Sequence, residues 1–318
     1  MSTQETIRLY DNDAYATEFE AAVLSCEPKA DTDNLYEVVL DQTLFFPEEG
    51  GQSPDKGVIN GINVVDVQIK NGIIIHTVDI AVTENEAGGE PDKTKHDKTN
   101  IDKTKLDKIS AGSHISGKID WQHRFYNMQQ HSGEHIFSGI VHSRFGFENV
   151  GFHLSDSVVT MDFSGVISPE DIADIEREVN VAITKNIPVE VTYPSKAELE
   201  SLEYRSKIEI EGQVRIVTVP GYDVCACCAP HVKRTGEIGM LKVMNYQNYK
   251  GGVRISILCG FRALEAFRQK SQIISELMGI FTTNQEAIID NVTKLKASNQ
   301  SLKSELGSVK AEILDYKI

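Results

Sequence analysis

Two groups of histidine and cysteine residues, far apart in the sequence, have the types and spacing of metal ligands. His131 and His135 are four positions apart in a stretch with a helical pattern, so both imidazoles can lie on one face of a helix and reach one ion. The stretch from Cys225 to His231 offers three thiols and an imidazole, of which Cys227 and His231 are the best further ligands. Nitrogen and sulfur donors of this kind are typical of zinc. The sequence therefore predicts a Zn²⁺ site.

Two other interpretations of these residues stay open. His131, Glu134 and His135 also fit the inverted zinc-protease pattern, in which the glutamate is the general base. Such a protease ordinarily uses a carboxylate as its third ligand and leaves the fourth position to water, whereas a cysteine and a histidine are the best downstream ligands here. A protease is therefore the second hypothesis. In the third, a closed zinc site joins a helix to a loop and has no catalytic role.

A glycine-containing loop is the next feature that could contribute to chemistry. Gly50 and Gly51 lie between Pro47 and Pro54, a pattern that makes a tight loop whose backbone can approach a ligand closely. An ordinary turn between two strands would have the same composition. The loop alone therefore does not distinguish a binding role from a connecting one.

The composition indicates a globular protein of a reducing compartment. Of the 318 residues 40% are hydrophobic, no run of 18 apolar residues could span a membrane, and the first residues do not resemble a secretory signal. Five cysteines are too few for a disulfide scaffold. We therefore expect a cytoplasmic protein with no membrane partner. The net charge is −15, and residues 1–90 hold 18 acidic and 4 basic side chains, which argues against nucleic-acid binding through that part.

The elements that must position these residues fall into three expected parts. Residues 1–110 have the pattern of a β-rich domain, residues 111–262 that of an α+β domain with a mainly antiparallel sheet, and residues 263–318 that of a long helix. The predicted strands are 19–26, 35–40, 62–69, 73–78, 157–163, 189–193, 214–219, 238–244 and 253–259. The predicted helices are 124–145 and 168–186, the second of which opens with a capping serine, a proline and two acids.

A polar repeat interrupts the first part. Near residues 91–108 the pair Asp-Lys recurs every five residues, a period that fits neither a helix nor a strand. The segment has almost nothing apolar to bury, so we expect a solvated insertion whose deletion leaves folding nearly intact. The alternative is a row of lysines that binds RNA phosphates. It is the weaker interpretation because each Lys follows an Asp, which offsets its charge.

The last part carries the clearest periodicity in the chain. From Ile288 to Tyr316 apolar residues are spaced alternately by four and three, and the same register extends back to Leu264. Such heptads predict a coiled coil, and a polar residue such as Asn299 at a core position usually fixes the register of a dimer. We therefore expect one helix of about 50 residues that pairs two chains into a homodimer. The alternative is a helix that folds back on its own domain.

The motifs, in this order, resemble those of the alanyl-tRNA editing proteins of the AlaX family and of the matching editing domain of alanyl-tRNA synthetase. The family pattern is a Tyr/Phe-Pro-Glu-Gly-Gly-Gly-Gln loop, then His-x-x-x-His, then Cys-x-x-x-His. The matching stretches here are 46–52, 131–135 and 227–231, with further similar stretches at 119–124 and 251–260. The resemblance covers roughly residues 5–265 and is specific because five separated motifs keep their order.

The resemblance implies a fold, a reaction and a set of site residues. It implies a small N-terminal β-barrel and hydrolysis of the ester that joins serine, or glycine, to tRNA(Ala). Gly50 and Gly51 are the candidates for contact with the aminoacyl end, and Gln52 and Glu134 are the candidate catalytic residues. The implied Zn²⁺ ligands are His131, His135, Cys227 and His231.

The chain departs from the family pattern at two places. Between Cys227 and His231 the usual Gly-Gly-Thr is replaced by Cys228, Ala229 and Pro230. In the glycine loop, Glu49 stands at a position that is usually glycine. Both changes bear on substrate preference more than on ligand identity. A zinc-stapled tRNA-binding module without turnover is the non-enzymatic alternative to editing.

Overall fold

The computed structural model describes residues 5–81, 103–206 and 212–316. They belong to two compact units, residues 1–262 and 263–318. Helices and mostly antiparallel sheets make up the first unit and helices the second, which confirms the predicted α+β class. Among the described residues, none of the helices combines the length and apolar character that crossing a bilayer requires.

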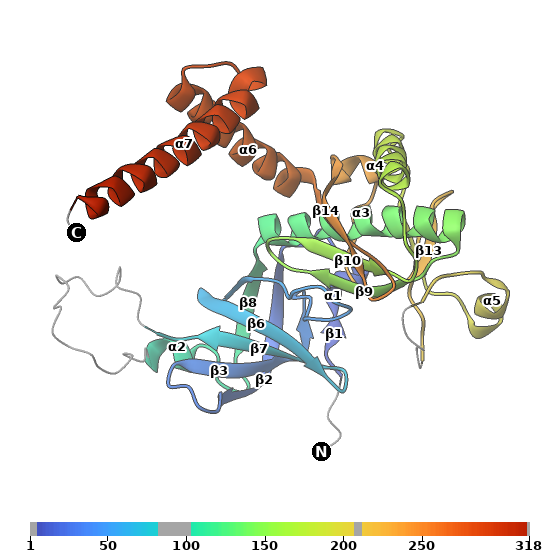
Figure 1. Ribbon diagram of the computed structural model, residues 1–318. Coiled ribbons are helices and arrows are strands. Elements are labelled where there is room, and N and C mark those ends of the chain that lie inside the picture. Colours follow the sequence, from blue (N-terminus) through green and yellow to red (C-terminus); the bar gives the residue numbers. More distant parts are fainter. Residues whose placement is uncertain (1–4, 82–102, 207–211, 317–318) are drawn as a thin grey trace. The chain divides into compact units, whose positions relative to one another are not determined.

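Six strands of the N-terminal part close into a barrel in the order β2-β3-β7-β6-β5-β8 (Figure 1). Each neighbouring pair is antiparallel. Along β2, buried Phe19, Ala21 and Val23 alternate with exposed or half-buried neighbours, which is the pattern of a strand with one face toward the core. The strands are β2 (Glu18–Pro28), β3 (Leu35–Leu40), β5 (Gly57–Ile59), β6 (Ile62–Lys70), β7 (Ile73–Asp79) and β8 (His114–Ile119).

The last barrel strand corrects the predicted boundary at residues 110/111. β8 was expected in the second part, but it pairs with both β2 and β5 and so completes the barrel. A boundary before β8 would leave the edges of both strands unpaired, and closure removes those edges. The first part therefore extends to the start of the helix that follows β8 at Trp121.

The polar insertion is shorter than predicted. Residues 91–102 of it lie outside the described part of the chain, but Lys103–Asp107 forms helix α2. Leu106 packs against the barrel core, and Ile109, just beyond the predicted segment, is fully buried. The Asp-Lys period concealed Leu106 and Ile109 because each is flanked by polar residues on both sides. A deletion that reaches them would remove part of the core.

Ile109 provides a stability test of this correction. Replacing Ile109 with alanine is expected to lower the free energy of unfolding by about 2–4 kcal/mol because it leaves a cavity in the barrel core. Chemical denaturation measures the change, with Ile101→Ala, inside the predicted insertion, as the comparison. A loss below about 0.5 kcal/mol for Ile109→Ala would show that this side chain is not part of the core.

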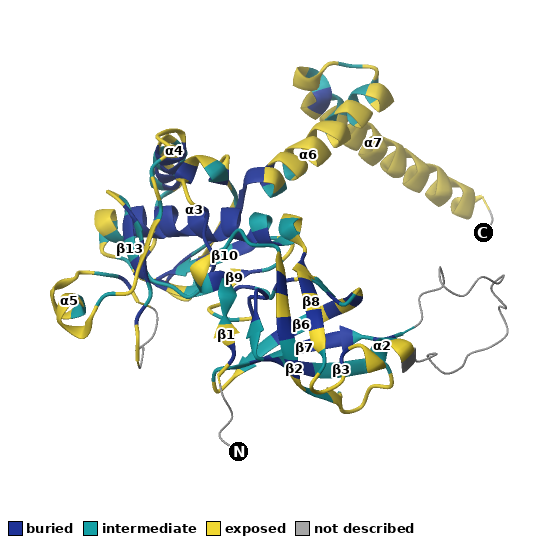
Figure 2. Cartoon of the chain, turned by 180° about the vertical axis from the view of Figure 1, so that it is seen from behind, coloured by how far each residue is buried: buried dark blue, intermediate teal, exposed yellow. Residues whose placement is uncertain are grey.

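A long helix, α3 (Trp121–Phe145), spans the second part of the first unit. It begins at Asp120, whose side chain accepts a hydrogen bond from the His123 N–H, and ends at Gly146 in the left-handed conformation. Its residues from Asn127 to Val141 are buried, as Figure 2 shows. At Gly139 an added Cβ would lie 2.2 Å from the Tyr222 carbonyl oxygen, so only glycine lets strand β13 approach the helix this closely.

Two sheets accompany α3. The four-stranded sheet has the order β14-β15-β10-β9 and the three-stranded sheet the order β11-β12-β13, both antiparallel. Helix α4 (Pro169–Thr184) begins after the Ser168 cap as predicted. The strands are β9 (Asn149–Leu154), β10 (Val159–Phe163), β11 (Glu190–Thr192), β12 (Ile216–Val219), β13 (Asp223–Ala226), β14 (Leu241–Tyr249) and β15 (Gly252–Cys259). The remaining short elements of this unit are β1 (Ile7–Arg8), α1 (Leu9–Asn12), β4 (Gln42–Thr43), α5 (Lys196–Ser201) and the 3₁₀ turn η1 (Thr235–Ile238).

The C-terminal part contains two helices where the sequence predicted one. Helix α6 (Gly260–Phe281) is separated from α7 (Ile288–Asp315) by a break and the 3₁₀ turn η2 (Gln285–Ala287). Thr282 adopts a left-handed conformation, and Asn284 caps the next turn by accepting a hydrogen bond from the Ala287 N–H. Because this local bonding competes with the helix, the expected continuous helix of about 50 residues is wrong.

The heptad stripe of α7 is exposed within the single chain. Val292, Leu295, Leu302 and Leu306 each keep at least 42% of their surface accessible, and Figure 2 shows the helix as almost entirely exposed. Exposed apolar residues at heptad spacing are what a coiled-coil partner would cover. Pairing between two chains stays a prediction.

Candidate metal centre

Four side chains from two separate segments converge on one point. His131 and His135 project from α3, while Cys227 and His231 lie in the loop after β13. Their donor atoms all lie within 4.8 Å of one another. Cys227 Sγ is 3.6 Å from His131 Nε2 and 3.3 Å from His231 Nε2. Three imidazole nitrogens and one sulfur at this spacing fit a tetrahedral Zn²⁺ site.

Each histidine is held by a hydrogen bond to its other ring nitrogen, Nδ1. Such bonds fix the tautomer and the orientation of the ring, and they are a regular feature of metal-binding histidines. With Nδ1 engaged, Nε2 is the nitrogen available to a metal ion. The three pairs are His131 Nδ1 with Gln52 Oε1 at 2.7 Å, His135 Nδ1 with Asp223 Oδ2 at 2.9 Å, and His231 Nδ1 with Ser132 Oγ at 3.0 Å.

The protonation of the cysteines distinguishes Cys227 from its neighbours. Burial alone would raise the pKa of the Cys227 thiol, but His131 and His231 lower it well below its usual value. Burial raises the pKa of Cys225 and of Cys228. Since a metal ligand must be deprotonated, Cys227 is the thiol suited to bind an ion at neutral pH.

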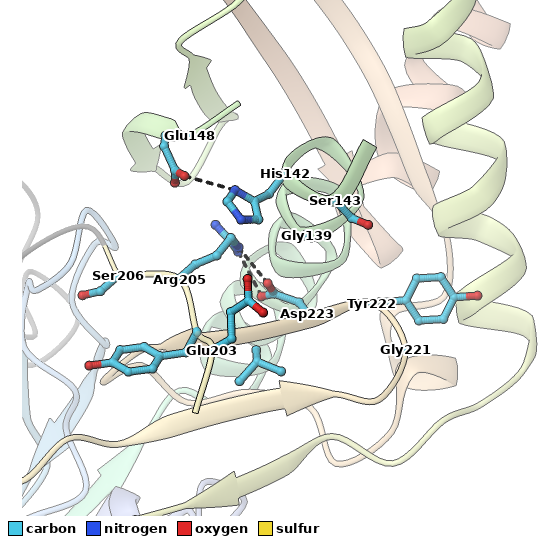
Figure 3. Close-up of a pocket in the computed structure, with 12 residues that line it drawn as sticks. Gly139, His142, Ser143, Glu148, Glu203, Arg205, Ser206, Gly221, Tyr222 and Asp223 are labelled. Carbon is cyan, nitrogen blue, oxygen red and sulfur yellow. Dashed lines mark hydrogen bonds and ion pairs between the residues drawn. The ribbon is translucent and has the colours of Figure 1, made fainter. Parts of the chain in front are cut away.

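A buried carboxylate supports His135 from behind. Asp223 accepts two hydrogen bonds from Arg205, at 2.7 Å from Nε and 2.9 Å from Nη2, in addition to the one from His135. Figure 3 shows Arg205 and Asp223 facing each other in a cavity of about 520 Å³ beside α3. Burial opposes ionisation of His135, but Asp223 and Cys227 outweigh it and raise the pKa of His135 to about 10. A metal ion that binds Nε2 displaces its proton, and the hydrogen bond from Nδ1 to Asp223 makes Nε2 a stronger donor.

The contribution of Asp223 can be measured as metal affinity. Asp223→Asn is expected to weaken zinc binding about 10- to 100-fold, because the amide cannot match the carboxylate as an acceptor for His135. Competition with a chromogenic chelator measures the affinity. Asp162 offers a matched control, since it also pairs with an arginine, Arg254, through two bonds of 2.6 Å. Equal losses in Asp223→Asn and Asp162→Asn would mean that the support of His135 is not specific.

The glycine loop delivers Gln52 to this centre. Gly50 and Gly51 both have left-handed φ values, of 63° and 85°, and the Gly51 carbonyl accepts a hydrogen bond from the Leu154 N–H at 2.7 Å. A Cβ on Gly51 would lie 2.4 Å from the Phe152 carbonyl oxygen, so the loop can lie against β9 only with glycine there. Gln52 is buried, and its Nε2 has no hydrogen-bond partner in the described part of the chain.

The predicted residues do not all face the same space. A cavity of about 930 Å³ is lined by Gly50, Gly51, His131, His135 and Cys227 among others. Gln52, His231 and Glu134 are not among its lining residues. The Oε1 atom of Glu134 accepts hydrogen bonds from Ser138 and Asn149, at 2.6 and 2.7 Å. The role of Glu134 as a base, and with it the protease hypothesis, stays a prediction.

Sequence reasoning missed Arg205 and Asp223, which complete the support of His135. Neither belongs to a motif with metal-ligand spacing. The one available signal was the placement of Asp223 four residues before Cys227, at the start of a short apolar run. Its contact with α3 depends on the close approach at Gly139, which a local pattern does not reveal.

Comparisons with known proteins find similarity to tRNA synthetase domains and to editing proteins. The profile of the threonyl and alanyl tRNA synthetase second additional domain matches residues 214–256, which include Cys227 and His231. The chain is 29% identical to alanyl-tRNA editing protein AlaX-L of Pyrococcus horikoshii, over 98% of the chain and 72% of that protein. It is 28% identical to alanyl-tRNA editing protein Aarsd1 of Bos taurus, over 91% of the chain and 63% of that protein. The chain is similar to the alanyl-tRNA editing proteins.

The similarity extends to alanyl-tRNA synthetases. The profile of class II (A) tRNA synthetases matches residues 3–99, the part that carries the glycine loop. Alanine–tRNA ligase of Methanobrevibacter smithii is 29% identical over 99% of the chain, which spans 34% of the ligase. The relatives thus cover the barrel, the metal centre and the C-terminal helices together.

Proposed function

We propose that the chain is a trans-editing hydrolase that removes serine, and as a second substrate glycine, from mischarged tRNA(Ala). The observation that carries the proposal is that one cavity is lined by Gly50 and Gly51 of the glycine loop and by three of the four potential metal ligands, His131, His135 and Cys227. Similarity to proteins named alanyl-tRNA editing proteins supports the same reaction. The runner-up, a tRNA-binding module without turnover, would not need an open cavity beside the ligand cluster.

The need for such an activity follows from the size of amino-acid differences. Serine adds one hydroxyl to alanine and glycine lacks one methyl. A pocket shaped for alanine discriminates against such neighbours by only about 1–3 kcal/mol. A second, hydrolytic site is the physical route to higher accuracy.

The residues have distinct proposed roles. His131, His135, Cys227 and His231 would hold Zn²⁺, which when bound supplies a Lewis acid beside the ester. Because four protein donors already complete a tetrahedron, we infer that the site orients the aminoacyl group rather than keeping a position open for water.

The glycine loop would hold the aminoacyl end. Gly50 and Gly51 present bare backbone to the cavity. Gln52 keeps the ring of His131 in place through Oε1, and its unpaired Nε2 is the donor that we assign to the substrate carbonyl.

Assembly is a further part of the proposal. The stripe on α7 would pair two chains into a homodimer, with Asn299 fixing the register. Each chain would then present its own cavity to a separate tRNA.

One assay separates the three functional hypotheses. The protein is incubated with seryl-tRNA(Ala), alanyl-tRNA(Ala) and casein under the same conditions. Selective release of serine from the first supports editing. Cleavage of casein supports a protease, and tRNA binding without release of an amino acid supports the non-catalytic module.

A further inference from the structure

Glu49 is a charged residue at the cavity to which neither the metal centre nor the fold gives a role. It stands in the glycine loop where the family pattern has glycine, and it lines the same cavity as His131 and Cys227. Its carbonyl oxygen accepts a hydrogen bond from the Gln52 N–H at 3.1 Å. The backbone of Glu49 is thus bonded to Gln52, the residue whose side chain holds His131. This places Glu49 close to the metal centre.

The carboxylate of Glu49 attracts Arg8, which lines the same cavity, but one of its oxygens is left without a hydrogen bond in the described part of the chain. This atom, Oε2, is shielded from solvent and has no hydrogen-bond partner among the described residues. A shielded carboxylate oxygen without a partner is costly, and an ammonium donor would satisfy it. The free acceptor therefore points to a cationic group on the ligand that enters the cavity.

The neighbours of Glu49 limit where the cationic group of a ligand can lie. Gly50 follows it in the loop, and a Cβ at Gly50 would be 3.7 Å from the thiol of Cys228. Cys228 is adjacent to Cys227, and its thiol shares a side-chain hydrogen bond with Glu49, so the carboxylate lies next to the segment that carries two of the potential metal ligands.

We propose that Glu49 binds the α-ammonium group of the aminoacyl ester, an inference that rests on the proposed function. The ammonium is the one cation that seryl and glycyl esters share, and a carboxylate beside it favours its charged form. Recognition through Glu49 selects esters with a free α-amine. It excludes N-acylated esters, such as those of peptidyl-tRNA, because acylation removes both the charge and the donors.

The test compares free and blocked amines in wild-type protein and in two loop variants. Binding is measured by calorimetry with serine joined by an amide to 3′-amino-3′-deoxyadenosine, a probe that is not an ester, and with its N-acetyl form. Hydrolysis is measured with seryl-tRNA(Ala) and N-acetylseryl-tRNA(Ala). Glu49→Gln removes the charge and keeps the shape. Glu48→Gln is the matched control, since Glu48 is exposed and contacts Gln68 at 2.8 Å.

Wild-type protein and Glu48→Gln are expected to bind the free amine about 10- to 100-fold more tightly than its N-acetyl form. Glu49→Gln should lose that preference while it keeps its zinc and its melting temperature. An unchanged preference in Glu49→Gln, or no preference in wild-type protein, overturns the inference. Absence of hydrolysis of both tRNA substrates by wild-type protein would instead refute the proposed function, and the binding data would still decide the role of Glu49.

Discussion

Replacing either His131 or Cys227 with alanine is expected to lower the zinc content from about one ion per chain to nearly none. The structure gives the reason, because the four donor atoms lie within 4.8 Å of one another and the pKa of the Cys227 thiol is lowered well below its usual value. A tetrahedral site rarely survives the loss of one donor. Hydrolysis of seryl-tRNA(Ala) should fall at least about 100-fold, since the metal supplies several kcal/mol. Metal analysis of the purified proteins measures the first effect directly.

Cys225 is the control for this experiment. Its thiol is buried, and together with His135 and Asp223 it forms a second group that could hold an ion. Burial raises its pKa, so it should remain a thiol, and Cys225→Ala should retain its zinc. Retention of zinc in both His131→Ala and Cys227→Ala would refute the assignment. Loss of zinc in Cys225→Ala alone would move the ion to the second group.

Full-length protein is expected to be a homodimer, and removal of residues 270–318 should convert it to a monomer. Helix α7 has 28 residues, and its exposed heptad stripe is long enough for a two-stranded coiled coil. The truncated protein keeps the barrel and the metal centre, because both lie in residues 1–262. It should therefore still hydrolyse seryl-tRNA(Ala). Light scattering at micromolar concentration measures the mass of both forms.

Two point variants of α7 separate pairing from a general effect of truncation. Leu302 belongs to the stripe and is 61% exposed, whereas Ser304 lies on the opposite side of the heptad pattern. Leu302→Glu should weaken the dimer, and Ser304→Glu should leave it intact. A full-length monomer would contradict the proposed pairing, and a dimer after truncation would place the interface in residues 1–269.

The sequence predicted elements with a strong period and missed those that depend on tertiary pairing. Strand β3 was predicted with both its bounds, because its apolar residues are closed off by turn residues. Strand β9 was missed because Gly151 and His153 interrupt its apolar pattern. The break at Thr282 was missed because a heptad register can be continued by spacing alone. The hydrogen bond that Asn284 accepts from the Ala287 N–H starts a new helical turn there, and the heptad spacing does not reveal this local polar contact.

The site was predictable to the extent that its residues occur in compact motifs. The spacing from His131 to His135 and from Cys227 to His231 indicated which atoms could meet, and the structure brings them together. Spacing did not indicate the direction of Glu134, which Asn149 and Ser138 set. Spacing also did not predict Arg205, because its role depends on its contact with Asp223 in another segment.

The most direct test of the account is hydrolysis of seryl-tRNA(Ala) by one preparation of protein before zinc removal, after removal by a chelator, and after zinc is restored. We expect selective release of serine over alanine, loss of activity without zinc and recovery when zinc returns. Full activity in protein shown to be free of metal, or equal hydrolysis of seryl- and alanyl-tRNA(Ala), would contradict it.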